Sequence, residues 1–256
     1  MKKMFIFLLL VLTTISIEAQ EKEVIEINRY YLDQFRLEKS QIDSITIATI
    51  NIPTANPDEP DAYVDLGLSV KWAKCNLGAT KPEGLGNCYA WGEINPKEKY
   101  DWSTYKWCVD CDSDAEDITT FTKYCSDWRI GYSNFEDHKY ELEPEDDAAT
   151  MTLGKPWRIP TPIEVDELIN NCTFQRTKLN GVSGYKITGK NGNSIFLPDD
   201  GNLPPQEEEG GSYWTSWCDD EEQYWDATDF EFYPTNTLII ENCGRCWANW
   251  IRPVHP

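Results

Sequence analysis

The chain has 256 residues, with 44 acidic side chains against 23 basic ones and a formal net charge of −21 at pH 7. A protein this acidic repels phosphate backbones and anionic lipid headgroups, so the composition argues against a nucleic acid partner. Histidine occurs only at His138 and His255, which argues against a Ser-His-Asp triad, a Cys-His pair or a zinc site with several imidazoles. We therefore expect no catalytic residues, no cofactor and no bound metal.

The first 19 residues have the pattern of a secretory signal peptide. Lys2 and Lys3 precede an apolar stretch at 4–14, and residues 17–20 (IEAQ) offer a small residue at a cleavage position. The apolar stretch is shorter than the roughly 20 residues of a membrane-spanning helix. The alternative, a short buried strand or helix, is disfavoured by the two lysines. We expect the mature protein to be exported to the periplasm, the outer surface or the extracellular medium, with no transmembrane segment.

The rest of the chain is predicted to have three parts. Residues 20–52 alternate polar and apolar side chains at 23–27 and 42–47, which predicts a short β segment. Residues 53–60 (PTANPDEP) contain three prolines among polar residues and predict a stiff linker. The main domain is predicted at 61–254.

Short runs rich in β-branched and aromatic residues predict strands along the main domain. They lie at 63–66, 68–73, 88–93, 184–188, 194–197, 213–217, 224–233, 237–241 and 247–254. The sequence 190–193 (KNGN) has Asn-Gly at its centre and predicts a hairpin turn. The segment 95–117 is polar and aromatic, and we predict it to be a loop.

Two helices are predicted from their end signals. The first spans 144–153, with acids in its first turn and a glycine just after its end. The second begins at a capping box from Thr161 to Glu164 and continues to about Asn170. Its apolar face is formed by Ile163, Val165 and Leu168. Two helices beside many short strands predict the fold class α+β.

Nine cysteines suit an oxidising compartment, although an odd number cannot pair completely within one chain. Cys108 and Cys111 form one CxxC pair, and Cys243 and Cys246 form another. We favour structural disulfides or buried thiols. A zinc site and a redox dithiol remain alternatives, although neither pair opens an amphipathic helix that would lower a thiol pKa.

Several motifs follow one another through the main domain. They are 63–73 (YVDLGLSVKWA), 75–79 (CNLGA), 89–93 (YAWGE), 145–149 (EDDAA), 157–161 (WRIPT), Glu164, Leu168, 193–198 (NSIFLP), 211–216 (GSYWTS) and 251–254 (IRPV). In this order they resemble the Fibrobacter succinogenes major paralogous domain of exported Bacteroidota proteins. The resemblance covers about 61–254. Residues 40–47 (SQIDSITI) are similar to a preamble that often precedes such domains.

The resemblance implies a C-type-lectin-like domain with two helices and short mixed strands, preceded by a small β segment. It implies an exported, non-enzymatic binding module whose loop-rich C-terminal half contacts a glycan or a protein. One alternative is a receptor of this fold that is the target of a diversity-generating retroelement. Another is an oxidase of the formylglycine-generating kind, for which Cys243 and Cys246 would be the only analogues, in a context that does not match.

A cluster of aromatic and acidic residues near the C-terminus is the candidate ligand face. Flat indole rings can stack on sugar rings or anchor a protein partner, and neighbouring carboxylates can bind hydroxyl groups. The candidate residues are Trp217, Asp219, Tyr224, Trp225, Trp247 and Asn249. Trp214 belongs to a motif of the resemblance and is predicted to be a core residue. The alternative is that the cluster consists of core aromatics and solvated acids.

Two other acidic groups have structural explanations. The run 110–117 alternates acids like a calcium loop, but it lacks the turn glycine and the final glutamate of an EF-hand, which favours a solvated loop. Asp146 and Asp147, with Arg158 and Glu164, could be a carboxylate pair with a positioning cation. Capping and first-turn roles already explain these four residues, and we predict that they are structural.

Overall fold

The computed structural model describes residues 24–29, 32–38, 62–111, 120–199, 211–218, 224–233 and 237–256. The chain divides into two units, Met1–Pro53 and Thr54–Pro256. The predicted signal peptide (1–19) and linker (53–60) lie outside the described residues. Within the described part, no helix has the length and apolar character that crossing a membrane requires.

The first unit contains an antiparallel hairpin. Strand β1 (Val24–Arg29) pairs with strand β2 (Leu32–Glu38). The strand predicted at 23–27 is therefore present, but its partner is a segment that the polar and apolar alternation did not single out. The other predicted strand, at 42–47, lies outside the described residues.

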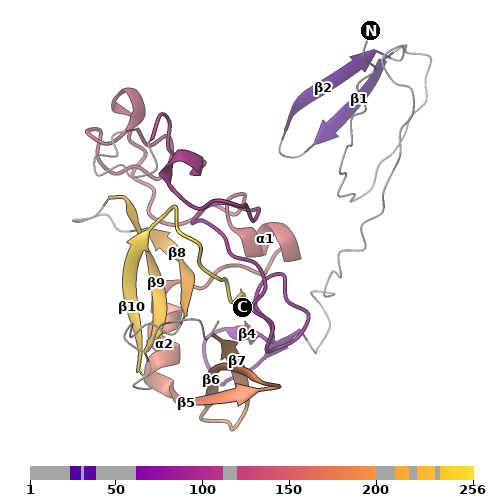
Figure 1. Cartoon of the computed structure of the whole chain (residues 1–256), viewed down its shortest axis with the longest axis vertical. Helices are drawn as coiled ribbons and strands as arrows, with labels where there is room; N and C mark the ends of the chain where they lie inside the picture. Colours follow the sequence, from indigo (N-terminus) through magenta and orange to yellow (C-terminus); the bar gives the residue numbers. More distant parts are fainter. Residues whose placement is uncertain are drawn as a thin grey trace. The chain divides into compact units, whose positions relative to one another are not determined.

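The second unit contains nine described strands and two α-helices. The strands are β3 (Tyr63–Val64), β4 (Lys71–Ala73), β5 (Cys172–Leu179), β6 (Val182–Gly189), β7 (Ser194–Pro198), β8 (Ser212–Cys218), β9 (Asp226–Tyr233), β10 (Thr237–Gly244) and β11 (Val254–His255). The helices are α1 (Ala148–Leu153) and α2 (Pro162–Asn171), with 3₁₀ turns at Trp102–Thr104 and Tyr132–Asn134. The strands form three antiparallel sheets, in the orders β11-β4-β3, β5-β6-β7 and β10-β9-β8 (Figure 1).

The predicted class, an α+β C-type-lectin-like domain with short mixed strands, is wrong, because the fold is β-rich. Strands account for 34% of the structure and helices for 13%. The two α-helices have only 6 and 10 residues, and the chain passes directly from α2 into β5 at Cys172. The two helices lie where their end signals place them, but they are short, and most of the regular structure around them is antiparallel strand.

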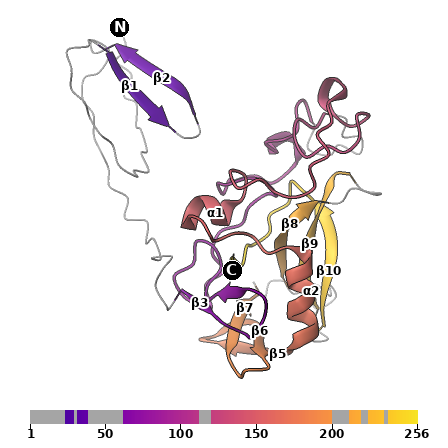
Figure 2. The same cartoon turned by 180° about the vertical axis from the view of Figure 1, so that it is seen from behind.

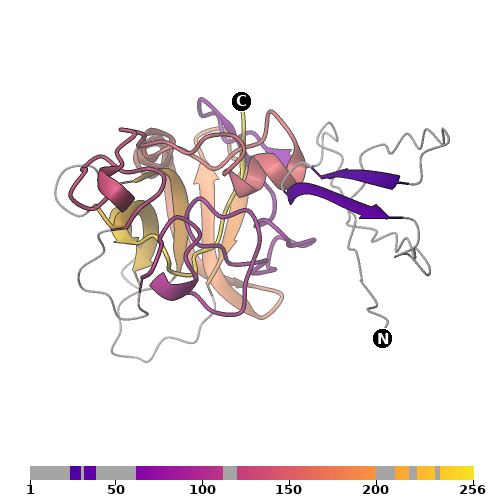
Figure 3. The ribbon, with the colours of Figure 1, turned by 90° about the horizontal axis from the view of Figure 1, so that it is seen from above.

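Long loops replace two of the predicted strands. The segment 88–93 contributes a single bridge, between Tyr89 and Asn249, and 247–254 is regular only where β11 begins. Seen from above, the loops of 74–111 and 120–147 lie in front of the strands (Figure 3). The β-rich sheets thus carry a layer of irregular backbone on one side.

Helix α2 begins with the predicted capping box. The Glu164 N–H donates to the Thr161 hydroxyl at 3.3 Å, and the Thr161 N–H donates to the Glu164 carboxylate at 2.9 Å. Val165 and Leu168 are buried, and the helix packs against β8, β9 and β10 (Figure 2). The prediction for Ile163 is wrong, since its side chain is 72% exposed. At about 100° per residue, Ile163 lies on the opposite side of the helix from Val165.

Helix α1 begins later than predicted, at Ala148. Asp147 is its N-cap and accepts the Thr150 N–H at 2.8 Å. The same carboxylate accepts the Ile159 N–H at 2.8 Å, and its burial raises the pKa of Asp147. The predicted first-turn acids therefore precede the helix, and Asp147 connects the helix to the segment that follows it.

Two aromatic clusters form most of the core. One lies between the sheets and includes Trp72, Tyr185 and Phe230. The other is built around Trp91, Tyr124 and Trp214. The prediction that Trp214 is a core residue is confirmed, and its indole N–H donates to the Tyr89 carbonyl at 2.7 Å.

The hairpin turn predicted at 190–193 is also confirmed. It joins β6 and β7, and the Gly189 N–H donates to the Asn193 carbonyl at 2.9 Å across the turn. Gly192 has a φ of 85°, a left-handed conformation that glycine adopts without a steric penalty. The local sequence is therefore sufficient to account for this turn.

The guanidinium of Arg252 joins segments that are far apart in the sequence. The side chain is fully buried, and burial lowers the pKa of Arg252. It donates to Asn76 Oδ1 at 2.9 Å, to the Ala73 carbonyl at 2.9 Å and to the Phe196 carbonyl at 2.8 Å. One side chain thus connects the end of β4, the following loop, strand β7 and the C-terminal segment.

Replacing Arg252 by methionine should lower the free energy of unfolding by about 3–5 kcal/mol, because three buried acceptors would lose their donor. Urea unfolding followed by tryptophan fluorescence would measure the change. Arg129→Met is the matched control, since Arg129 is exposed and pairs with Asp127 at the surface. We expect the control to change the stability little, and an equal loss in both variants would contradict the role of Arg252.

Candidate functional site

Three exposed tryptophans lie at one end of the sheet β10-β9-β8. Trp217 is 40% exposed, Trp225 is 38% exposed and Trp247 is 56% exposed. We call these three residues the tryptophan face. The end of β10 is the upper end of this sheet in Figure 1. Exposure of three large aromatic side chains on an otherwise well-packed sheet is unusual, and such surfaces commonly bind ligands.

The backbone brings the three tryptophans to the same end. Trp217 is the penultimate residue of β8, and Trp225 immediately precedes β9, which runs antiparallel to β8 and β10. The Trp225 carbonyl accepts the Arg245 N–H at 3.0 Å. Trp247 closes the turn after β10, where its N–H donates to the Gly244 carbonyl at 2.9 Å.

A buried arginine supports the turn that carries Trp247. Arg245 donates to the Asp226 carbonyl at 3.0 Å and to the Tyr124 carbonyl at 2.7 Å. Its guanidinium carbon lies 5.5 Å from the centre of the Trp91 ring and 5.0 Å from that of Phe121. These contacts fix the turn against the aromatic core, so the backbone that carries Trp247 is held in place.

Tyr224 lies beside a surface ion pair. It is half-buried, and Asp127 accepts hydrogen bonds from both the guanidinium and the backbone N–H of Arg129. The Arg129 contacts, with a smaller contribution from a hydrogen bond to Tyr224, lower the pKa of Asp127. Trp128, between these two charged residues, is exposed. Tyr224 therefore links the tryptophan face to the loop 127–129.

Some exposed aromatics were missed by the sequence analysis. Trp128, Tyr132 and Phe135 are all exposed, and they come from a segment that resembles none of the family motifs. The signal that could have found them is the density of aromatic residues among turn-forming polar ones between 124 and 140. A carboxylate was also missed, since Glu141 is exposed and forms an isolated bridge with Trp217.

Asn249 does not contribute to the exposed face, because it is buried. Its amide donates to Asp229 Oδ2 at 3.1 Å and to Cys243 Sγ at 3.2 Å. Ser212 also donates to the Asp229 carboxylate. The amide of Asn249 therefore stabilises the inside of the sheet and is not available to a ligand.

Asp219, the remaining candidate, lies outside the described residues, as do residues 112–119 of the acidic run. Within the described part of the chain, no three or more His, Cys, Asp and Glu side chains are grouped so that they could hold a metal ion.

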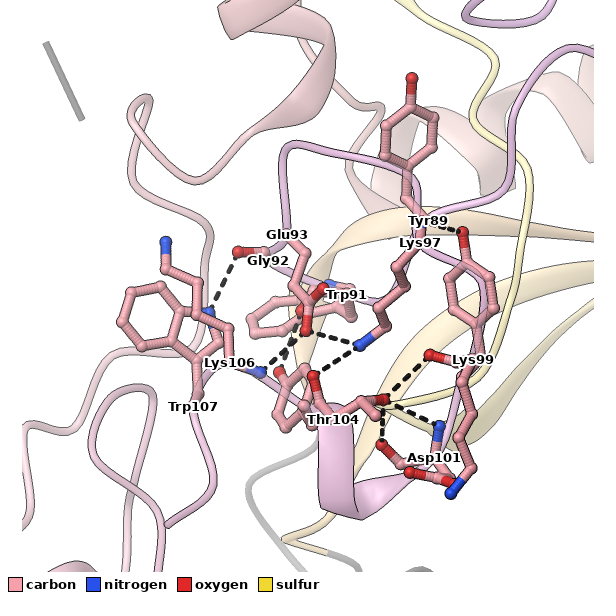
Figure 4. A network of polar contacts seen from close by, with 12 residues as sticks. Tyr89, Trp91, Gly92, Glu93, Lys97, Lys99, Asp101, Thr104, Lys106 and Trp107 are labelled. Atoms are coloured by element: carbon pink, nitrogen blue, oxygen red, sulfur yellow. Dashed lines mark hydrogen bonds and ion pairs between the residues drawn. The ribbon is translucent and has the colours of Figure 1, made fainter. Parts of the chain in front are cut away.

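Buried carboxylates hold the loops beneath the candidate site. Glu93 accepts the Lys97 ammonium at 2.9 Å and the Lys106 N–H at 2.8 Å, as Figure 4 shows. Asp146 accepts the Lys123 ammonium at 2.5 Å and the Tyr124 hydroxyl at 2.8 Å. Both carboxylates are occupied by neighbouring donors, which is what a structural role requires.

Asp147, Arg158 and Glu164, the other residues of the suspected carboxylate site, also have structural partners. Asp147 caps α1, as described above, and Arg158 donates to both carboxylate oxygens of Glu164, one of them at 2.7 Å. Glu164 in turn completes the capping box of α2. Each of these residues thus makes a specific contact that accounts for it structurally.

The two CxxC pairs differ. Cys108 and Cys111 form a disulfide, whereas Cys243 and Cys246 are buried thiols that are not joined to each other. Burial raises the pKa of Cys243 well above its usual range and that of Cys246 to about 12. A neutral thiol is a poor nucleophile and a poor metal ligand, so these contacts favour a structural role for the second pair.

Comparisons of the chain with protein-family models, curated proteins and solved structures found no match.

The buried carboxyl beside Asn249 should make stability depend on pH. Burial raises the pKa of Asp229, and hydrogen bonds from Ser212 and Cys243 oppose the shift only in part. A carboxyl with a raised folded-state pKa stabilises the fold fully below its unfolded pKa, about 3.9, and that contribution is lost as the pH rises toward the folded-state value.

Asp229→Asn keeps the size of the side chain and removes its titration. The free energy of unfolding of the native protein, minus that of the variant, should therefore fall as the pH rises above about 4. Urea titrations at several pH values would measure this difference. Asp166→Asn, at an exposed position of α2, is the control and should give the smaller slope. Equal slopes for the two variants would be evidence against the raised pKa.

Proposed function

We propose that the mature chain is an exported, non-enzymatic binding module that contacts its ligand through the tryptophan face, and that the ligand is a glycan. The observation that carries the proposal is the grouping of Trp217, Trp225 and Trp247, all exposed, at one end of a rigid sheet. Indole rings in a soluble protein are normally covered. Rings held exposed by well-packed backbone are suited to stacking on the flat faces of sugars or on a partner's apolar side chains.

The surroundings of the face favour a sugar over a flat protein partner. An isolated β-bridge places the exposed Glu141 opposite Trp217, and Asp127 lies beside Tyr224. Carboxylates next to aromatic rings can accept hydrogen bonds from sugar hydroxyls while the rings stack. A protein partner remains an outcome that the experiment below distinguishes.

Export and family membership are parts of the same proposal. The basic and apolar pattern of residues 1–19 supports secretion. The ordered motifs between 63 and 254 support membership of the Fibrobacter succinogenes major paralogous domain family. The binding interpretation is preferred over an oxidase because the thiols of Cys243 and Cys246 are buried with raised pKa values.

Truncating any of the three indoles should weaken binding. We expect Trp217→Ala, Trp225→Ala and Trp247→Ala each to cost about 2 kcal/mol, or roughly 30-fold in affinity, as buried aromatic anchors do. A glycan array with the mature protein would identify the ligand, and calorimetry would measure its affinity for each variant. Ile163→Ala, on the exposed side of α2, is the control and should bind like the native protein.

Other results would overturn the proposal. Glycan binding that survives all three substitutions would exclude this face. A silent array, together with a captured protein that is lost in the same variants, would replace the glycan with a protein ligand. Substrate turnover by the pure protein that one side-chain substitution abolishes, such as copper-dependent oxygen consumption lost in Cys243→Ser, would replace binding with catalysis.

A further inference from the structure

A second concave site lies on a different sheet from the tryptophan face. It is a cavity of about 540 Å³, within the range of about 300–1,000 Å³ that is usual for small-molecule sites. Its lining residues are Val64, Lys74, Pro82, Thr177, Lys178, Leu179, Lys186, Ser194, Ile195 and Phe196. Most of them belong to β5, β6 and β7, which lie at the lower end of the unit in Figure 1, away from the end that carries the tryptophan face.

One wall of the cavity is the outer face of the sheet β5-β6-β7. Lys186 pairs with Phe196 across the two strands, so their side chains share a face. The neighbours of Lys186 along β6, Tyr185 and Ile187, point the other way, into the main core. Leu179, near the end of β5, pairs with Val182 on the same face as Lys186. The side chains of this face therefore point away from the core cluster that contains Tyr185 and Ile187.

The second wall comes from the start of the domain. Val64 belongs to β3, Lys74 follows β4, and Pro82 lies in the loop beyond it. This loop is tied to the sheet, because the Asn180 amide at the tip of the β5–β6 hairpin donates to the Glu83 carboxylate at 2.8 Å. Two segments about 100 residues apart in the sequence thus enclose the cavity, and the hydrogen bond between Asn180 and Glu83 connects them.

The charge of the cavity opposes the charge of the chain. Its ten described lining residues include Lys74, Lys178 and Lys186 and no acid, whereas the whole chain carries −21. Lys186 is exposed, and its ammonium group makes no hydrogen bond or ion pair with any described residue. The nearest acid of the loop, Glu83, already accepts from Asn180. Lysines keep their ammonium groups hydrated at a rim while their stems cover apolar surface.

We propose that this cavity binds a small organic anion that has an apolar body and a carboxylate. Val64, Leu179 and Phe196 would cover the body, and Lys186 would pair with the carboxylate. Electrostatic complementarity of this kind selects the anion and orients it. A bare inorganic anion would leave the apolar wall uncovered, and a neutral hydrocarbon would leave the Lys186 ammonium without a counter-charge. The site is independent of the proposed glycan binding.

Decanoate and 1-decanol test the two requirements separately, because they share a chain and differ in charge. Calorimetry with the full mature protein at pH 7 should show saturable binding of decanoate and at least tenfold weaker binding of decanol. Acetate, which has the charge without the body, should also bind at least tenfold more weakly. Decanoate affinity should fall as salt is added, because ion pairing at an open rim is screened.

Lys186→Gln should weaken decanoate binding about tenfold, the equivalent of about 1.4 kcal/mol. Lys155→Gln makes the same charge change at an exposed position outside the cavity and should leave binding unchanged. Trp247→Ala should also leave it unchanged, which separates this site from the tryptophan face. Circular dichroism would confirm that the variants fold. Equal binding of decanoate and decanol, or equal affinity in the Lys155 and Lys186 variants, would overturn the proposal.

Discussion

The second unit depends on one buried cation more than on any single sheet. Its three sheets have three strands each, and two of the nine strands contain only two residues. Strands of two residues are shorter than is usual in globular proteins. Arg252 compensates by donating to acceptors near β4 and on β7 from the segment that leads into β11. A guanidinium can do this because its donors point in several directions in one plane, which an ammonium group cannot match.

Side chains that bind several partners also stabilise the loops, where carboxylates take the place of regular backbone hydrogen bonding. Asp137 accepts the N–H groups of Tyr124, Cys125 and Lys139. Glu93 and Asp146 bind lysines and backbone in the neighbouring loops. Irregular backbone needs such partners, because unpaired buried N–H groups are costly. This accounts for a share of the acidic composition that a solubility argument alone would leave unexplained.

The two proposed sites use the sheets in different ways. The tryptophan face lies at the end of a sheet, where strand ends and a turn present large rings supported by Arg245. The lysine-lined cavity lies on the outer face of another sheet, where Lys186 and Phe196 stand side by side. Rings at the end of a sheet can contact a ligand that extends beyond the protein, whereas a covered sheet face can enclose a small ligand. The architecture can therefore support two ligands of different chemistry.

Local patterns were enough to predict several elements of this protein. The capping box at Thr161, the hairpin turn at 190–193 and the core position of Trp214 could all be derived from the sequence. Each of these depends on residues within a few positions of one another, or on a motif of a known family. The start of α1 and the overall class could not be derived, because acids before a helix resemble acids in its first turn and because the share of strand depends on pairing between distant segments.

Only the tertiary structure decided which of the candidate residues reach the surface. Asn249 is buried against Asp229 and Cys243, although its neighbour Trp247 is exposed. The lysine-lined cavity could not have been found from the sequence, since Lys74 and Lys186 are separated by more than 100 residues. Hydrogen bonds within a turn are encoded by adjacent residues, but burial and enclosure depend on which distant segments pack together.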